Sequence, residues 1–194
     1  NAFGTSALGD CTTGHNNNAF GRQALRRVTT GNENTAMGHD AGKEITTGDE
    51  NVAIGNLTFD ANTTGTDNTA IGSRALGANT TADNNTAVGY GALTANTTAS
   101  NNTALGYQAG YTNTTGTQYV FVGYRAGYQQ TGASAGSVAV GYEALYAAGG
   151  PQRNVALGTQ ALYATTNYGD NNTGVGYRAL FSNTSGSVNV AVGV

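Results

Sequence analysis

The sequence predicts an all-β protein, a parallel β-solenoid (β-roll) of about 11–12 coils, on three observations. A phrase of the form Asn-Thr-Ala-apolar-Gly returns every 17 residues, with two intervals of 18. Glycine is abundant, with 30 residues, whereas only 10% of the residues are charged and one is proline. No segment free of Gly, Asn and Thr clusters reaches the ~12 residues that a marginal helix needs. A short, fixed period means that each unit buries its apolar face against its neighbours.

The glycine that closes each phrase is called the anchor glycine. The anchor glycines are Gly4, Gly21, Gly38, Gly55, Gly72, Gly89, Gly106, Gly123, Gly141, Gly158, Gly176 and Gly193.

The residues just before each anchor glycine predict the first strand of a coil. The preceding residue is always large and apolar, from Phe3 to Val192, and we expect this column in the core. The residue before that is nearly always Ala, as at Ala36 and Ala53, and in a strand it points to the opposite face. We expect this alanine face to be packed closely as well, against other copies of the chain.

A second apolar pair follows three and four residues after the anchor, as in Ala24-Leu25 and Ala92-Leu93. We interpret it as a second strand, so that each coil has two strands of four or five residues joined by Gly and Asn turns. The anchor glycine predicts a positive φ or a close backbone approach. The Asn-Thr-Thr turns predict hydrogen-bonded ladders of Asn and Thr.

The thin apolar content of each coil predicts association. One large apolar residue, one Leu and two Ala at ~25 cal/mol per Å² offset little of the entropy lost in ordering 17 residues. A homotrimer wound around a fibre axis is the natural symmetric arrangement. No break in the repeat marks a boundary, so residues 1–194 form one repetitive domain, which we interpret as a segment of a longer fibre protein.

Charge and hydropathy exclude two classes of partner. The net charge is -3, and a chain with so few basic residues is not expected to bind nucleic acid. No run of ~18 apolar residues exists, so no membrane insertion is expected. Cys11 is alone, which excludes an internal disulfide.

We assign no catalytic residue, metal ligand or cofactor, and the chain is not expected to be an enzyme. His15, His39 and Cys11 stand at positions that other coils fill with unrelated polar residues. The segment 38–43 lacks the length and the Ser or Thr of a phosphate-binding loop. Asp49-Glu50 leaves a weak Ca²⁺ contact open, with solvation as the simpler interpretation.

The tyrosines have two interpretations. Stacked aromatic rings shield the edge of the coils, or ring faces and Asn amides form a strip that binds glycans. The column that follows the anchor glycine consists of Tyr90, Tyr107, Tyr124, Tyr142 and Tyr177. A second column consists of Tyr111, Tyr128, Tyr146, Tyr163 and Phe181.

Asn-x-Thr or Asn-x-Ser triplets also recur in the turns, and they are candidate glycosylation sites. These candidates are Asn62, Asn79, Asn96, Asn113 and Asn183.

The phrases Asn51-Val52-Ala53-Ile54-Gly55 and Asn189-Val190-Ala191-Val192-Gly193 resemble the head repeats of trimeric autotransporter adhesins, which are trimers of parallel β-rolls. The longer unit at 102–116 is similar to repeats of phage-type tail fibres and of related bacterial surface proteins. The resemblance covers all 194 residues. It implies an extracellular fibre, on a virion tail or a bacterial surface, that is built from self-association.

The expected function is therefore that of a structural and adhesive fibre segment that displays or contributes to receptor binding, with cell-surface glycans as candidate partners. Two alternatives stay open. One is a monomeric solenoid that binds ice or glycans through its Thr, Tyr and Asn ladders. The other is a fibre that cleaves polysaccharide, which needs clustered carboxylates that the uncharged middle of the chain does not offer.

Overall fold

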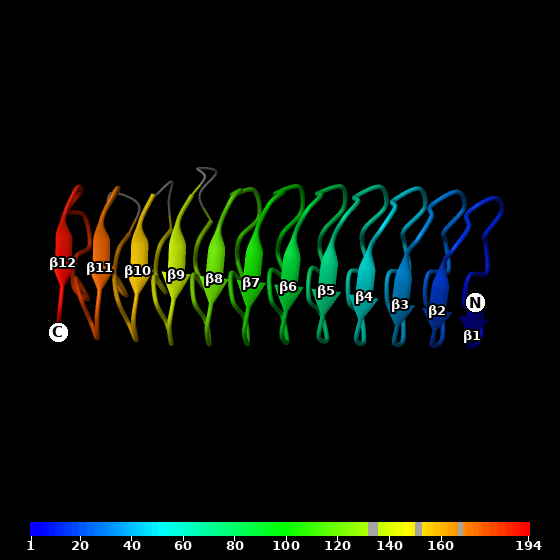
Figure 1. Ribbon diagram of the computed structural model, residues 1–194, viewed down its shortest axis with the longest axis horizontal. Coiled ribbons are helices and arrows are strands. Elements are labelled where there is room, and N and C mark those ends of the chain that lie inside the picture. The colour runs from blue at the N-terminus through cyan, green and yellow to red at the C-terminus, as the bar shows by residue number, and fades with distance from the viewer. Residues whose placement is uncertain (132–135, 150–152, 167–168) are drawn as a thin grey trace.

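The computed structural model describes residues 1–131, 136–149, 153–166 and 169–194. In these residues the chain forms a parallel β-solenoid without helix, in which each coil contributes one strand to a single 12-stranded sheet. The strands lie side by side in chain order along the long axis, with the termini at opposite ends (Figure 1). Eleven steps of ~4.8 Å give the sheet a length of about 53 Å. The predicted fold class is thus confirmed.

The strands are β1 Ala2–Phe3, β2 Asn18–Phe20, β3 Thr35–Met37, β4 Val52–Ile54, β5 Thr69–Ile71, β6 Thr86–Val88, β7 Thr103–Leu105, β8 Val120–Val122, β9 Val138–Val140, β10 Val155–Leu157, β11 Thr173–Val175 and β12 Val190–Val192.

Every strand pairs in register with the equivalent strand of the next coil, so that identical repeat positions form columns. Ala36 pairs with Ala53 and Met37 with Ile54, and the same register continues through β10, β11 and β12. The two 18-residue intervals leave this strand register unchanged on either side.

The predicted second strand is wrong. The Ala-Leu pair lies in a turn, in which Leu25 has a φ of +48° and Leu93 a φ of +50°. Because this left-handed step reverses the direction of the chain, Ala24 and Leu25 both face the interior, whereas a strand would point them to opposite sides. Coils are joined here by separate backbone hydrogen bonds, such as Leu25 N to Ala41 O at 3.0 Å and Arg27 N to Lys43 O at 3.1 Å.

The two faces of the sheet are also reversed relative to our prediction. The central Ala of the strands points into the solenoid and is fully buried, as at Ala19 and Ala87. The large apolar residue before the anchor glycine points outward, and Met37 is 50% exposed and Leu105 48%. The interior of a 17-residue coil is narrow, and leucines from the turn and an asparagine column already fill it. We had expected the alanine column to be a surface between chains. This expectation is wrong, because the column lies inside the solenoid.

The anchor glycine meets both conditions predicted for it. Gly89 has a φ of +131°, and a Cβ on this residue would lie 2.4 Å from the carbonyl oxygen of Gly106. Only glycine permits this approach between successive coils.

Two asparagine columns hold the turns. The buried amide of Asn34 donates to Asn17 Oδ1 at 3.2 Å and to Gly48 O at 2.8 Å, and Asn51 repeats this pattern on Asn34. This ladder uses the first residue of the Asn-Thr-Ala phrase. The asparagine of the Asn-Thr-Thr turn acts within its own coil instead, as where Asn113 accepts from Gly116 N and donates to Gly116 O. The predicted asparagine ladder therefore exists, at the other column.

The predicted threonine ladder is confirmed. Thr29 Oγ1 donates to Thr46 O at 3.1 Å, and Thr46 Oγ1 donates to Thr63 O at 3.0 Å. In the pairs from Thr12-Thr13 to Thr97-Thr98, the first threonine donates this bond.

Candidate functional site

Two aromatic ladders run along the turn side of the solenoid. The anchor ladder is the column Tyr90, Tyr107, Tyr124, Tyr142 and Tyr177, and the turn ladder is Tyr111, Tyr128, Tyr146, Tyr163 and Phe181. From Tyr90 to Tyr142, neighbouring rings of the anchor ladder lie 5.1–5.5 Å apart between centroids, with interplanar angles of 6–12°. Rings of the turn ladder lie 5.0–5.3 Å apart. Ring stacking is thus confirmed from Tyr90 to Tyr142 in the anchor ladder and from Tyr111 to Phe181 in the turn ladder.

Stacking decides which parts of the rings a ligand can reach. The face of an interior ring, such as Tyr107 or Tyr124, is covered on both sides by its neighbours. Ring edges and phenol oxygens remain accessible along the ladder. A glycan that stacks on ring faces therefore finds them only where a ladder ends or is interrupted.

A polar column separates the two ladders and was missed by our sequence analysis. It consists of Gln108, Arg125, Glu143, Gln160 and Arg178, each two residues after an anchor glycine and each with a φ between +50° and +55°. Arg125 Nε donates to Gln108 Oε1 at 3.0 Å, and Gln160 Nε2 donates to Glu143 Oε2 at 3.1 Å. The signal in the sequence was the recurrence of long polar residues directly after the tyrosines.

Two arginines of the polar column contact rings of both ladders. The guanidinium carbon of Arg125 lies 5.2 Å from the ring centroids of both Tyr124 and Tyr128. Arg178 lies 5.4 Å from the centroid of Tyr177 and 4.8 Å from that of Phe181. These distances are those of cation–π contacts, which hold the charge between the aromatic columns.

Two tyrosine phenols in this region have raised pKa values. Desolvation, with the Glu143 carboxylate as the next cause, raises the pKa of both Tyr142 and Tyr163. At neutral pH both phenols are therefore neutral, and each can donate a hydrogen bond.

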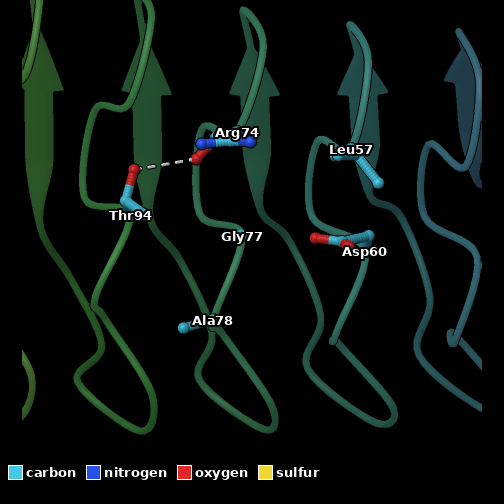
Figure 2. A pocket seen from close by; sticks show the side chains of 6 residues that line it. All are labelled: Leu57, Asp60, Arg74, Gly77, Ala78 and Thr94. Carbon is cyan, nitrogen blue, oxygen red and sulfur yellow. Dashed lines mark hydrogen bonds between the residues drawn. The ribbon is translucent and has the colours of Figure 1, made fainter.

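A hollow of about 250 Å³ lies further toward the N-terminus, at the glycine position of the turn column. Figure 2 shows Asp60, Gly77 and Thr94 on three successive coils, with the Asp60 carboxyl directed toward the Gly77 coil. Thr94 Oγ1 donates to Arg74 O at 3.0 Å at its edge. Partial burial raises the pKa of Asp60, and its own backbone hydrogen bond opposes this shift. The hollow exists because Gly77 has no side chain.

The histidines and the cysteine are not brought together. Cys11 Sγ donates to Gly14 O at 3.3 Å, whereas His39 contacts Arg22 and Asn56. Within the described ranges, no three His, Cys, Asp or Glu side chains form a group that could hold a metal ion. No helix that is long and apolar enough to cross a membrane is found in the same residues.

Four of the candidate glycosylation sites have inaccessible amides. Asn62, Asn79, Asn96 and Asn113 are 0% exposed, and each amide nitrogen donates to a backbone carbonyl three residues later. A glycan on these Nδ2 atoms is incompatible with the folded coil. Asn183, near the C-terminal end, is half-buried and makes the same contact with Gly186 at 2.9 Å.

The outward face of the sheet is a second candidate surface, which we call the outer apolar face. It consists of Phe3 and of the first and third positions of strands β2 to β12, filled mostly by Thr or Val and by a large apolar residue. Phe20 is 42% exposed and Leu105 48%. A parallel sheet is normally covered on both sides, so this long apolar face has the character of a contact surface.

We compared the chain with protein families, curated proteins and solved structures, and no family model, curated protein or solved structure matches it.

Proposed function

We propose that the chain is a structural and adhesive segment of an extracellular fibre, on a virion tail or a bacterial surface, and that it assembles as a homotrimer through the outer apolar face. The observation that carries the proposal is this face itself, which extends over twelve strands. Water would otherwise contact side chains such as Met37 and Val140, which are 50% and 37% exposed. Covering them releases about 25 cal/mol per Å².

The chemistry of the face favours a second copy of the same chain as its occupant. The face is uncharged at every strand position and repeats at the step of the sheet, ~4.8 Å. A copy aligned along the same axis has the same step and the same side chains, so its columns can interlock over the whole length. Three such chains close around one axis and leave no apolar face uncovered.

The solenoid suits a mechanical role. Strand pairing joins each coil to the next, and asparagine and threonine ladders and stacked rings add contacts along the axis over parts of the length. A rod of about 53 Å per chain holds a receptor-binding region away from the particle or cell. The proposal assigns no catalytic residue and no cofactor.

The native mass of the chain tests the assembly. We expect light scattering on a sizing column to give about three times the chain mass of 19.6 kDa. Val88→Lys with Leu105→Lys places charges in the middle of the outer apolar face and should yield monomers. Thr98→Lys, on an exposed corner away from this face, is the matched control and should stay trimeric. A folded wild-type monomer would refute the trimeric fibre.

The monomeric ice-binding alternative has one observation in its favour. The second threonine of the turns is exposed in seven successive coils, at Thr13, Thr30, Thr47, Thr64, Thr81, Thr98 and Thr115. The first threonine is engaged with the next coil, so the array is one residue wide. Thermal hysteresis above that of an inert control protein would support this alternative, and its absence would exclude it.

A further inference from the structure

The anchor ladder is interrupted by one coil. Rings follow each other without a gap from Tyr90 to Tyr142, but the next position holds Thr159 and the one after it Tyr177. The strands keep their register across this point, since Val140 pairs with Leu157 and Leu157 with Val175. Tyr142 and Tyr177 are therefore two coil steps apart, or ~10 Å at ~4.8 Å per step.

The interruption leaves Tyr142 and Tyr177 without a stacked ring on the sides that face each other, and the Arg178 guanidinium carbon lies 5.4 Å from the Tyr177 ring centroid. One face of Tyr142 is covered by Tyr124 at 5.1 Å, and the other is directed toward Thr159, which has no ring. Tyr142 is 48% exposed and Tyr177 52%, compared with 39% for Tyr124 inside the ladder. The gap is a slot with an aromatic ring at each end and the exposed Thr159 between them.

The wall of the slot is polar. Gln160 bridges Glu143 and Arg178, since its amide donates to Glu143 Oε2 at 3.1 Å and its oxygen accepts from Arg178 Nε at 2.9 Å. These bonds fix three side chains in a row beside the slot. Glu143 also takes part in a side-chain hydrogen bond with Tyr142. The remaining lone pairs of its carboxylate and the terminal nitrogens of Arg178 can serve as acceptors and donors for a ligand. Behind this wall, the turn ladder is continuous from Tyr146 to Phe181.

We propose that the slot formed by Tyr142, Thr159 and Tyr177 binds a single pyranose ring of a neutral glycan. A flat aromatic ring at carbon contacts of ~3.5–4.0 Å on both sides needs tyrosines only ~7–8 Å apart, so it would fill a ~10 Å slot poorly. A puckered pyranose with axial hydrogens is thicker. Its C–H bonds meet the electron-rich ring faces, and its hydroxyls pair with the Glu143–Gln160–Arg178 wall.

This site goes beyond the proposed fibre role and does not depend on trimerisation, because all its residues belong to one chain. It replaces the idea of a glycan strip along the whole anchor ladder with one defined position. A single sugar of about a dozen heavy atoms is expected to bind with a Kd of about 1 mM. Several slots on one particle would bind a repetitive glycan more tightly through multivalency.

The test is a proton NMR titration with methyl glycosides of glucose, galactose, mannose and N-acetylglucosamine, both anomers of each. A bound sugar between two tyrosine rings experiences ring currents, so its ring protons should shift upfield in a saturable way. Thr159→Tyr completes the ladder and fills the slot, and we expect it to weaken binding at least tenfold. Tyr90→Thr removes the ring at the other end of the same ladder without leaving a gap between two rings, since the preceding coil has Ser73, and it should leave the shift unchanged. Far-UV circular dichroism checks that each variant is folded.

Three results would overturn the proposal. The first is the absence of a saturable shift for every glycoside at about twenty times the expected Kd. The second is a Thr159→Tyr chain that binds like the wild type, or a Tyr90→Thr chain that loses binding. The third is saturable binding of phenol, a planar ring, when no glycoside binds. Light scattering on the same samples reports the trimer separately, so failure of the slot and failure of the fibre proposal are distinguishable.

Discussion

Phe121 is the one aromatic residue at the central strand position, where the other described strands from β2 to β12 have Ala or Gly, and its replacement tests how this core is packed. Its ring is fully buried and lies 5.1 Å from that of Tyr119. The turns on both sides carry glycine where most coils have Leu. A Cβ on Gly127 would lie 2.4 Å from the Phe121 ring, and one on Gly110 would lie 2.7 Å from it. The ring thus fills the space that two leucines would otherwise occupy.

We expect Phe121→Ala to lower the free energy of unfolding by about 3–5 kcal/mol. A buried Phe hides ~150–250 Å² of apolar surface, of which a methyl group retains a small part. At ~25 cal/mol per Å², the loss of ~100–150 Å² accounts for about 2.5–4 kcal/mol, and the cavity adds to this. The surroundings cannot collapse into the space, because glycines 110 and 127 bring no side chain.

The assay is equilibrium urea unfolding followed by far-UV circular dichroism, in a cycle with Gly127→Leu. In the presence of Phe121, the added leucine clashes with the ring and destabilises the chain. In Phe121→Ala, the same leucine fills the cavity and should restore about 1–2 kcal/mol, since residues in contact couple by ~0.5–3 kcal/mol. Leu is tolerated at this φ of +61°, as Leu145 adopts +53° at the equivalent position. A loss below about 1 kcal/mol for Phe121→Ala, or an equal effect of Gly127→Leu in both backgrounds, would refute this account.

Three further predictions concern the backbone, the asparagine ladder and the hollow. Gly77→Ala should raise the free energy of unfolding by about 0.4–1 kcal/mol, because no positive φ is required there and the nearest atom is 3.4 Å from the new Cβ. Gly89→Ala should lower it. Thermal melts of the two variants test both expectations. Asn68→Ala should cost about 1–3 kcal/mol in urea unfolding, since the buried Asn51 Oδ1 and the backbone N–H of Asn85 each lose a partner; a cost near zero would contradict the role of the ladder. Asp60 has a raised pKa, so the folded chain holds its proton more tightly than the unfolded chain, and stability falls as pH rises from the ordinary value of 3.8 through the raised one. Asp60→Asn should therefore melt higher than the wild type at neutral pH and equally below both pKa values; equal melting temperatures throughout would show that burial does not perturb Asp60.

The period, the strand position and the anchor glycines were predictable from the sequence, because each is a repeated local signal. Which face of the strand points inward was not. Size alone suggested Met37 and Leu105 as core residues, but the room inside a coil is set by residues far away in the repeat, such as Leu25 and Asn34. Only the placement of these residues shows that nothing larger than Ala fits at the central strand position of most coils.

The turn around Leu25 was misjudged although the sequence held a clue. Two successive buried residues in every coil, one small and one large, do not fit the alternation of a strand. The left-handed φ of a leucine has no signature of its own, unlike that of glycine. The slot at Thr159 had a clear signature, a threonine in a column of tyrosines, but its meaning depends on the stacking of the rings on either side.

Because the columns are in register, the number of coils sets the length of this molecule. Strand pairing and the asparagine ladder recur from one coil to the next around residues 51–85, so removing residues 68–84 would join two surfaces that already match. The rod would shorten by one step of ~4.8 Å, and no new kind of contact would be required. A lineage that gains or loses 17 residues can thus change the length of the solenoid in fixed increments while its fold stays the same.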